Sequence, residues 1–328
     1  MHKISVVISN YNYVDFVGPA IESALALDWP DVEVVVVDDG STDGSLAVIR
    51  SFGDRVTVLA TENATQRVAA NRGFAASTGD VVIFLDSDDL LPADLPVHLA
   101  AVWNDRVSKV QFRMQRVDRD DIPFGRPFPD YDPVPTPEQI RRWAELTTAY
   151  PTPPGSANAY ARWFLDKVMP VGPEVGNAAD SALLAAAPFF GDVVSVPEVV
   201  VSYRRHGGND SALGDDASRF PREVVRARAR WRFARLAHGS TDVDERPLFN
   251  SRELLQLRVA SRVFAPSEHP LGGDGALRMA LDSLRSPWRP GPEAWSRRVV
   301  VAAWCLLTLA APVALARRSV LRRYRSSH

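Results

Sequence analysis

Two stretches decide the fold: VEVVVVDDGSTD at residues 32–43 and VVIFLDSDD at residues 81–89. Each is a run of mainly β-branched and apolar residues that ends abruptly in aspartates. Such runs are typical of strands that are buried on both faces, as in a parallel sheet. We therefore expect both strands to lie inside a sheet and to present acids at their carboxyl ends, where open α/β sheets bind ligands.

Alternating strands and helices extend from these two stretches. Residues 4–9 and 56–60 predict two further strands, and apolar spacing predicts helices over 14–27, 42–52 and 65–77. This order predicts a mainly parallel sheet flanked by helices, which is the α/β class.

The rest of the chain is less regular. We expect a strand over 109–117, a long loop over 120–137 and a helix over 178–187. Short strands are expected at 193–196 and 199–203, followed by arginine-rich helices. The expected domains are a catalytic domain over 1–215 with halves 1–110 and 111–215, a helical extension over 216–292, and a membrane-associating helix and tail over 293–328.

Charge is distributed unevenly along the 328 residues, whose net charge is −2. Residues 1–110 hold 7 basic and 16 acidic side chains, whereas residues 219–328 hold 21 and 9. The acidic front argues against a nucleic-acid groove, and the basic end favours an anionic partner such as a membrane surface. The single cysteine, Cys305, excludes an internal disulfide framework. The first residues lack the features of a signal peptide, so we expect the catalytic part to stay in the cytosol.

The aspartates at the two strand ends have different expected roles. Asp38 and Asp39 can hydrogen-bond ribose hydroxyls or base N–H groups, although a plain turn with a helix cap is the alternative. Asp86 and Asp88 can share a divalent hard cation with diphosphate oxygens, and a solvated acidic loop is the alternative there. With Asp89, three aspartates at one strand end would repel each other without a cation.

Four motifs in this order resemble the family 2 glycosyltransferases of the GT-A fold. They are Val6–Asn12, Val37–Asp43, Ala69–Gly73, and Gly79-Asp80 leading to Leu85–Asp89, and a weaker similarity continues to about Ser211. The resemblance implies an inverting transfer of a sugar from a nucleotide-sugar donor.

The resemblance also implies a role for each matching residue. Tyr11 is expected to border the nucleobase, Asp39 to bind it, and Arg67 or Asn71 to lie near the nucleotide. Asp86 and Asp88 match the family's DxD element, which binds ribose and the Mn²⁺ or Mg²⁺ that holds the diphosphate. The expected nucleotide-sugar-binding residues are Ser9, Tyr11, Asp39, Arg67, Asn71, Asp86, Ser87 and Arg204, and the expected metal ligands are Asp88 and His206.

The family's general base usually sits in a Glu-Asp pair at a helix start. Asp180 matches the base, but Ala179 replaces the preceding acid, and a structural cap is the alternative for Asp180. The segment from Tyr203 to Ser211 looks like a late family motif. There His206 is either a metal ligand, a diphosphate contact or a structural histidine, and Arg204 or Arg205 is expected to clamp phosphate.

One apparent motif is discounted. Residues 139–143 spell the QxxRW pattern of processive family members, but they precede Asp180 by about 40 residues, whereas the pattern follows the base in those enzymes. We therefore expect one sugar to be added per event.

The C-terminal third suggests membrane contact. Residues 299–316 are free of charge and flanked by arginines, and at 1.5 Å per residue a helix of this length spans about 27 Å. The heavier arginine cluster would lie outside if this helix spanned the bilayer, so we expect a membrane-associated or re-entrant helix. A buried core or oligomer helix is the alternative.

The sequence thus predicts a metal-dependent bacterial hexosyl- or related sugar transferase at the cytoplasmic side of the cell membrane. A UDP-sugar is the favoured donor and a saccharide or lipid-linked molecule of the cell envelope the favoured acceptor. A sugar-1-phosphate nucleotidylyltransferase is disfavoured, because no Gly-rich basic loop follows the first strand. A catalytically inactive nucleotide-sugar-binding or scaffold protein remains the alternative, supported by Ala179.

Overall fold

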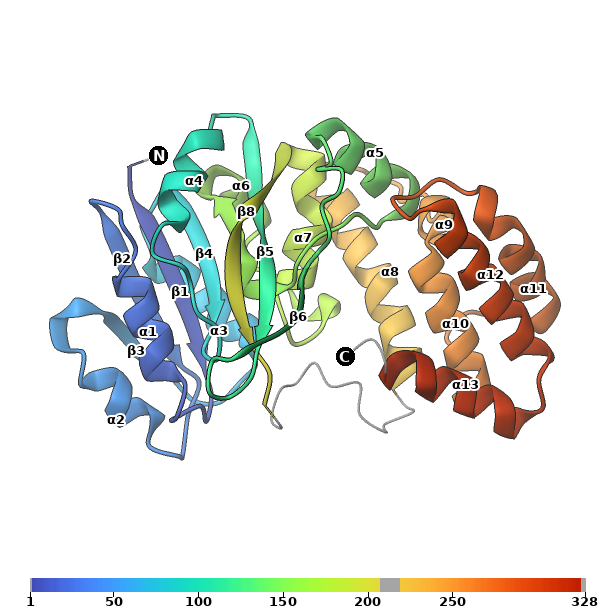
Figure 1. Cartoon of the computed structure of the whole chain (residues 1–328), viewed down its shortest axis with the longest axis horizontal. Coiled ribbons are helices and arrows are strands. Elements are labelled where there is room, and N and C mark those ends of the chain that lie inside the picture. The colour runs from blue at the N-terminus through green and yellow to red at the C-terminus, as the bar shows by residue number, and fades with distance from the viewer. Residues whose placement is uncertain (1, 207–218, 326–328) are drawn as a thin grey trace. The chain divides into compact units, whose positions relative to one another are not determined.

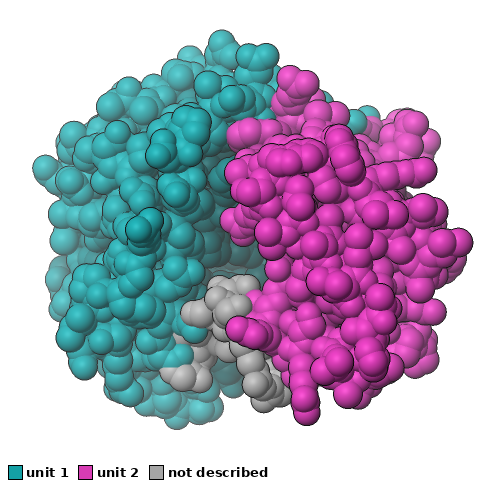
Figure 2. Space-filling model, turned by 45° about the vertical axis from the view of Figure 1, so that its right-hand side comes forward, with its two compact units in different colours: residues 1–141, 151–207, 233–239 teal, residues 142–150, 208–232, 240–328 magenta. Residues whose placement is uncertain are grey.

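The computed structural model describes residues 2–206 and 219–325. The chain divides into two compact units, which Figure 2 colours separately. Unit 1 comprises residues 1–141, 151–207 and 233–239, and unit 2 comprises residues 142–150, 208–232 and 240–328.

Unit 1 is built on one mixed sheet with the order β3-β2-β1-β4-β7-β5-β6, and β8 pairs with β5 (Figure 1). The first four strands in this order run parallel, whereas β7 is antiparallel to both β4 and β5. The strands are β1 (Ile4–Asn10), β2 (Val32–Asp38), β3 (Thr57–Ala60), β4 (Val81–Asp86), β5 (Val107–Val117), β6 (Pro123–Phe128), β7 (Asn158–Ala161) and β8 (Asp192–Arg204).

Helices cover both faces of the parallel part, because side chains alternate along each strand. Ile4, Val6 and Ile8 of β1 join a core with the buried face of α1 (Val17–Leu25). Val7 points the other way, toward α3 (Gln66–Ala76), where a Cβ on Gly73 would lie 2.3 Å from its Cγ1. Glycine at position 73 therefore lets α3 pack closely against β1, and the four predicted strands and their helices are confirmed.

The second half of the sheet differs from the expectation in two places. The expected loop over 120–137 contains β6, which pairs antiparallel with β5. The two short strands expected at 193–196 and 199–203 form one strand, β8, whose pairing with β5 shifts register between Phe112 and Arg113. Such an irregularity lets one strand continue past the interruption at Pro197 and Glu198.

The remaining elements of unit 1 carry and support the site. They are α2 (Ser45–Arg50), α4 (Leu95–Val102), α6 (Arg162–Val168), α7 (Asp180–Phe190) and the short 3-10 turns η1 (Gly53–Arg55), η2 (Gly155–Ala157) and η3 (Pro173–Val175). Two helices, α5 (Pro137–Thr147) and α8 (Arg219–Ala237), contribute residues to both units.

Unit 2 is helical. Its further helices are α9 (Arg246–Asn250), α10 (Arg252–Phe264), α11 (Ala276–Arg285), α12 (Trp295–Ala310) and α13 (Val313–Arg325), with the turn η4 (Ser286–Trp288). Leu255 and Val259 of α10, Met279 of α11, and Val301 and Cys305 of α12 share a small buried core.

The continuous helix expected over residues 299–316 is wrong. Its residues fall into α12 and α13, separated by Ala311 and Pro312. Ala311 is extended, with φ −75° and ψ 150°, because a residue before proline is kept out of the helical region. In the part of the chain that the structure describes, no helix is long and apolar enough to cross a membrane.

Candidate active site

At the end of β2, the carboxylates accept hydrogen bonds from neutral donors. Asp38 accepts hydrogen bonds from the Asn10 side chain (2.8 Å) and from the Ser41 backbone N–H (3.1 Å). The buried Asp39 accepts one from the backbone N–H of Ala64 at 3.0 Å, and Arg72 lies 3.9 Å away. These contacts fix the turn that leads into α2.

The end of β4 is tied to its neighbours by two serines. Ser87 donates from Oγ to the carbonyl of Ser9 at 2.7 Å, so β1 and β4 are linked beyond their last paired residues. Ser156 accepts from the backbone N–H of Asp86 (3.0 Å) and donates to Asp89 (2.6 Å). The residues at both strand ends are thereby held at one edge of the sheet.

Asp88 and His206 form a nearly buried pair. Their Oδ2 and Nε2 atoms lie 3.0 Å apart, and each side chain is 11% exposed. The His206 ring stacks on Phe16 with a centroid distance of 4.6 Å and meets Tyr13 edge-on at 5.5 Å. Aromatic packing thus fixes the imidazole plane so that one ring nitrogen faces the carboxylate.

The carboxylates of Asp88 and Asp89 lie in an unfavourable environment for negative charge. Burial raises the pKa of Asp88, although the hydrogen bond to His206 opposes that shift. Burial raises the pKa of Asp89 well above its ordinary value, and the neighbouring charges of Asp88 and Asp86 raise it further. An added positive charge at this strand end would relieve the repulsion.

Arg204 supports this strand end from β8. Its guanidinium donates to the backbone carbonyls of Asp88 (3.0 Å) and Arg119 (3.1 Å) and pairs with Asp121 at 2.6 Å. Its backbone N–H donates to Asp89 at 3.1 Å. The phosphate-binding role expected for Arg204 stays a prediction. The expected motif continues from Gly207 to Ser211, which lie outside the described residues.

Arg67 and Asn71 of α3 hold the segment that leads to α7. Arg67 donates from its side chain to the carbonyls of Val171 and Gly176, both at 3.0 Å, and from its backbone to that of Asn177 at 2.7 Å. Asn71 both donates to the Val171 carbonyl (3.0 Å) and accepts from its N–H (2.9 Å). We call these two side chains the α3 clamp.

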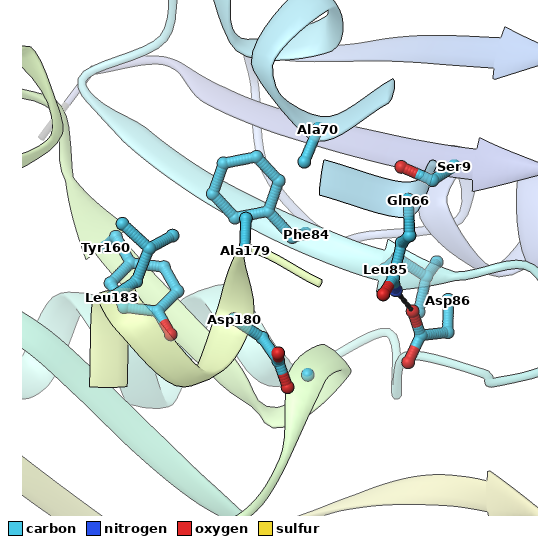
Figure 3. Close-up of a pocket in the computed structure, with 11 residues that line it drawn as sticks. Ser9, Gln66, Ala70, Phe84, Leu85, Asp86, Tyr160, Ala179, Asp180 and Leu183 are labelled. Carbon is cyan, nitrogen blue, oxygen red and sulfur yellow. Dashed lines mark hydrogen bonds between the residues drawn. The ribbon is translucent and has the colours of Figure 1, made fainter. Parts of the chain in front are cut away.

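Asp180 is the first residue of α7 and lines a small pocket together with Asp86. Figure 3 shows the two acids reaching the pocket from different elements, α7 and the end of β4. Gly155 also lines it, and a Cβ there would lie 2.8 Å from Asp86 Oδ2. The lining residues are Ser9, Gln66, Ala70, Phe84, Leu85, Asp86, Gly155, Tyr160, Ala179, Asp180 and Leu183.

The helix start places Asp180 favourably for a charged carboxylate, because the unpaired N–H groups of a helix N-terminus attract negative charge. Its Oδ1 accepts from the backbone N–H of Ser181 at 2.6 Å. The neighbouring Ala179 is buried and contributes only a methyl group to the pocket.

Several residues at the site have no counterpart among the predicted ones. Gln66 donates to Asp86 Oδ1 at 2.6 Å, the bond drawn in Figure 3, and Ser156 bridges Asp86 and Asp89. The predicted nucleobase contact Tyr11 is 46% exposed in the loop after β1 and stays a prediction.

The residues fit a divalent cation only in part. Asp88 and His206 offer an oxygen and a nitrogen ligand beside each other, and the charges of Asp88 and Asp86 raise the pKa of the neighbouring Asp89. Among the described residues, no group of three or more His, Cys, Asp and Glu side chains gathers around one point. The remaining ligands of an octahedral ion would have to come from diphosphate oxygens and water.

The sequence of the chain is similar to those of known proteins. The family model "Glycosyl transferase family 2" matches residues 5–168. An uncharacterised glycosyltransferase of Nostoc sp. is 35% identical over 214 residues, covering 63% of this chain and 66% of that protein. The succinoglycan biosynthesis protein ExoO of Rhizobium meliloti is 41% identical over 93 residues, or 28% and 27% of the two chains. The matches thus span less than two thirds of the length of these relatives.

Two solved structures share the fold. The S. aureus TarS 1–349 structure with UDP superposes with a TM-score of 0.55 at 16% identity, covering 99% of this chain and 92% of that one. A mannosyltransferase from Pyrobaculum calidifontis, with GDP-Man and Mn²⁺, gives 0.50 at 18% identity, covering 99% and 86%. The expected α/β fold of the GT-A type is confirmed, and the chain belongs to glycosyl transferase family 2.

Proposed function

We propose that the protein is an inverting glycosyltransferase that moves one sugar from a nucleotide-sugar donor to an acceptor hydroxyl. The observation that carries the proposal is the shared pocket of Asp86 and Asp180, next to the buried carboxylates of Asp88 and Asp89. One acid cluster suits a diphosphate and its cation, and the separate acid suits proton removal from the acceptor.

The donor is expected along the carboxyl ends of β1, β2 and β4. Tyr11 and Asp39 would contact the nucleobase, and Ser9, Asp86 and Ser87 the ribose and sugar. Ligands of open α/β sheets bind at this edge, and the solved neighbours hold UDP, UDP-GlcNAc and GDP-Man. A UDP-sugar is the favoured donor.

The proposed cofactor is Mn²⁺ or Mg²⁺, held by Asp88 and His206. Bound there, it would neutralise charge that develops on the leaving nucleoside diphosphate. The P. calidifontis neighbour holds Mn²⁺, which supports the choice. Phe16 and Tyr13 fix the histidine ring beside Asp88, which keeps the two proposed ligand atoms together at this strand end.

Asp180 is the proposed general base. Its carboxylate takes the proton from the acceptor hydroxyl while the hydroxyl oxygen bonds to the anomeric carbon of the donor sugar. The bond from that carbon to the diphosphate oxygen breaks in the same step, and its electron pair leaves with the nucleoside diphosphate. Attack and departure on opposite faces invert the anomeric configuration.

The α3 clamp is the proposed positioning device for this base. Arg67 and Asn71 hold the backbone of Val171 and Gly176, a few residues before Asp180. Effective proton transfer requires the base within about 3 Å of the hydroxyl. Fixing the segment before α7 therefore keeps Asp180 at the pocket.

The acceptor is proposed to be a saccharide or lipid-linked molecule of the cell envelope, at the cytoplasmic side of the membrane. The basic C-terminal third supports this class, because it favours an anionic lipid surface. Transfer of a single sugar per event is also proposed, because the QxxRW pattern has a local structural explanation. The Thr136 backbone N–H donates to the Gln139 side chain at 2.9 Å, and the Gln139 backbone N–H donates to the Thr136 hydroxyl at 3.2 Å. The two residues thus cap the start of α5 reciprocally.

The proposal is tested by release of nucleoside diphosphate from a panel of UDP-, GDP- and dTDP-sugars, with Mn²⁺ or Mg²⁺ and then with EDTA. We expect slow release from one donor, loss in EDTA, and loss in Asp88→Ala. The control is Val97→Ala, at an exposed position of α4. Binding of all donors without any release in the presence of saccharide acceptors would instead support the scaffold alternative that Ala179 suggests.

A further inference from the structure

Helix α11 exposes a stripe of large apolar side chains. Leu277, Leu281 and Leu284 follow one another at helical spacing and are 76%, 43% and 53% exposed. Trp288, four residues further on in the turn η4, is 74% exposed. The opposite side of α11 buries Met279 and Ser283, so the helix is strongly amphipathic with its second apolar face uncovered.

Helix α12 repeats this pattern. Its inner side, with Val301, Cys305 and Thr308, is buried. Its outer side presents Val300 and Leu307, which are 60% and 72% exposed, with Ala303 between them. A helix in water normally turns polar residues outward, and α12 instead presents aliphatic ones.

The two outer faces are joined at the turn between the helices. The rings of Trp288 and Trp295 meet edge-on with a centroid distance of 5.7 Å, and both are exposed. Met279 of α11 and Cys305 of α12 share the buried core behind them. The α11–α12 surface, as we name it, consists of Leu277, Leu281, Leu284, Trp288, Trp295, Val299, Val300 and Leu307.

Exposed arginines occur on the helices of this surface and on the following helix, whereas residues 276–323 contain no fully exposed acid. The exposed arginines of α11, α12 and α13 are Arg278, Arg285, Arg297, Arg317, Arg318 and Arg322. Within residues 276–323, all of which the structure describes, the acids are Asp282 and Glu293. Asp282 is paired with Arg258 and Arg289, and Glu293 with Arg252, so neither is fully exposed.

We propose that the α11–α12 surface docks on a bilayer containing anionic lipid, with the helices lying in the membrane interface. Leucines would enter the acyl boundary, tryptophans would lie at headgroup level, and arginines would contact phosphates. This charge complementarity favours lipid over a second copy of the chain. A two-fold contact between identical patches would bring arginines toward arginines.

The α11–α12 surface lies in a part of the molecule that the transfer chemistry does not use. The proposed contact is made by two helix faces, including that of α11, rather than by the single helix expected over 299–316. Only its connection to a lipid-linked acceptor rests on the proposed function.

The test is flotation of the full chain with vesicles of phosphatidylcholine, with and without about 40% phosphatidylglycerol, in the absence of donor and acceptor. We expect binding to the anionic vesicles, weakened at least about tenfold in the double variant Leu281→Glu/Leu284→Glu. Arg278→Glu/Arg285→Glu should weaken binding by a similar factor and reduce its sensitivity to salt.

The matched control is Val97→Glu, a similarly exposed apolar residue on α4 in unit 1. It should bind vesicles as the parent does, and circular dichroism melting of every variant establishes that it is folded. Absence of parent binding to anionic vesicles would overturn the proposal. So would a dimer, found by sedimentation velocity, that Leu281→Glu/Leu284→Glu disperses without any vesicle binding. Donor hydrolysis measured on the same samples reports separately on the proposed function.

Discussion

The ends of β2 and β4 carry the same sequence signal and differ in how their charge is balanced. Both strands run from buried aliphatic residues into consecutive aspartates. At β2, Asp38 and Asp39 accept hydrogen bonds from Asn10, Ser41 and Ala64. At β4, burial raises the pKa of Asp88 and of Asp89, and the charges of Asp88 and Asp86 raise that of Asp89 further.

This difference separates a strand end whose carboxylates already accept hydrogen bonds from one whose buried carboxylates favour an added cation. Carboxylates that accept several N–H bonds are stable as anions. Buried carboxylates close to one another are costly as anions, and a cation removes much of that cost. Of the two strand ends, the one at β4 is therefore the one at which a cation and a diphosphate would gain most.

The largest expected effect comes from the acid that faces the β4 end across the pocket. Asp180→Asn should lower the rate of sugar transfer by about 10³-fold, because a general base contributes 10²- to 10⁴-fold. Donor binding, measured by calorimetry, should stay within about twofold of the parent. Transfer at the parental rate would remove Asp180 from the role of base.

A pair of variants tests the comparison directly. Asp88→Asn should weaken Mn²⁺-dependent donor hydrolysis by about 10- to 100-fold, because one ligand is weakened. Asp38→Asn should keep the metal response but lower the free energy of unfolding by about 2 kcal/mol, because its amide N–H₂ would face a donor. Loss of the metal response in Asp38→Asn, with Asp88→Asn unaffected, would reverse the assignment of the two strand ends.

Much of this architecture follows from the sequence, because the parallel strands are continuous aliphatic runs and each ends at an aspartate or a turn. The missed strand β6 lies in a proline-rich segment with exposed residues at its start, and no alternation marks it. The break between α12 and α13 is not predicted from the sequence, because the apolar run continues on both sides of Pro312.

The site is less predictable, because its contacts join distant segments through the backbone. Carbonyl acceptors such as those of Val171 and Gly176 leave no trace in residue type, so the backbone contacts of the α3 clamp are not predicted from the sequence. The nucleotide contacts expected for Arg67 and Asn71 stay predictions. The roles of Gln66 and Ser156 are equally hard to predict from the sequence, because glutamine and serine are common in loops and at helix starts. The roles expected for Asp39, Asp88, Asp180 and His206 stay predictions.

Weakening the α3 clamp, which holds the segment before Asp180, should have an intermediate effect on the transfer rate. Asn71→Asp removes the donor to the Val171 carbonyl while keeping size, and should reduce the transfer rate by about tenfold through loosened positioning of Asp180. The donor KM should change by less than about twofold if the clamp acts only on the base. The rate and the KM are measured in one acceptor-dependent assay. A rise in the donor KM alone would indicate that Asn71 contacts the nucleotide rather than positioning the base.

The smallest effect concerns Glu33, a hydrogen-bonded carboxylate at the start of β2. Bonds from Lys3, Ser5 and Thr78 outweigh its burial and lower its pKa to about 2. Its stabilisation is therefore complete above pH 4.5 and is lost as the pH falls toward 2. With solvent screening, Glu33→Gln should lower the free energy of unfolding by about 1 kcal/mol at pH 7 and by much less near pH 2.

The same unfolding series gives the contrast with β4. Because the pKa of Asp88 is raised on folding, ionisation of Asp88 lowers the free energy of unfolding as the pH rises above 3.8. In EDTA, the free energy of unfolding of Asp88→Asn should therefore rise relative to that of the parent over this pH range. Urea unfolding at several pH values measures both trends. Parallel trends for Glu33→Gln and Asp88→Asn would contradict the distinction drawn between the two kinds of carboxylate.

The most direct test of a cation and nucleotide at the β4 end is calorimetric titration of UDP and GDP into the parent and Asp88→Asn, in Mn²⁺ and in EDTA. The account predicts that one nucleotide binds the parent at least about tenfold more tightly in Mn²⁺, and that Asp88→Asn loses most of this difference. Equal binding in Mn²⁺ and EDTA, or an unchanged metal effect in Asp88→Asn, would contradict it.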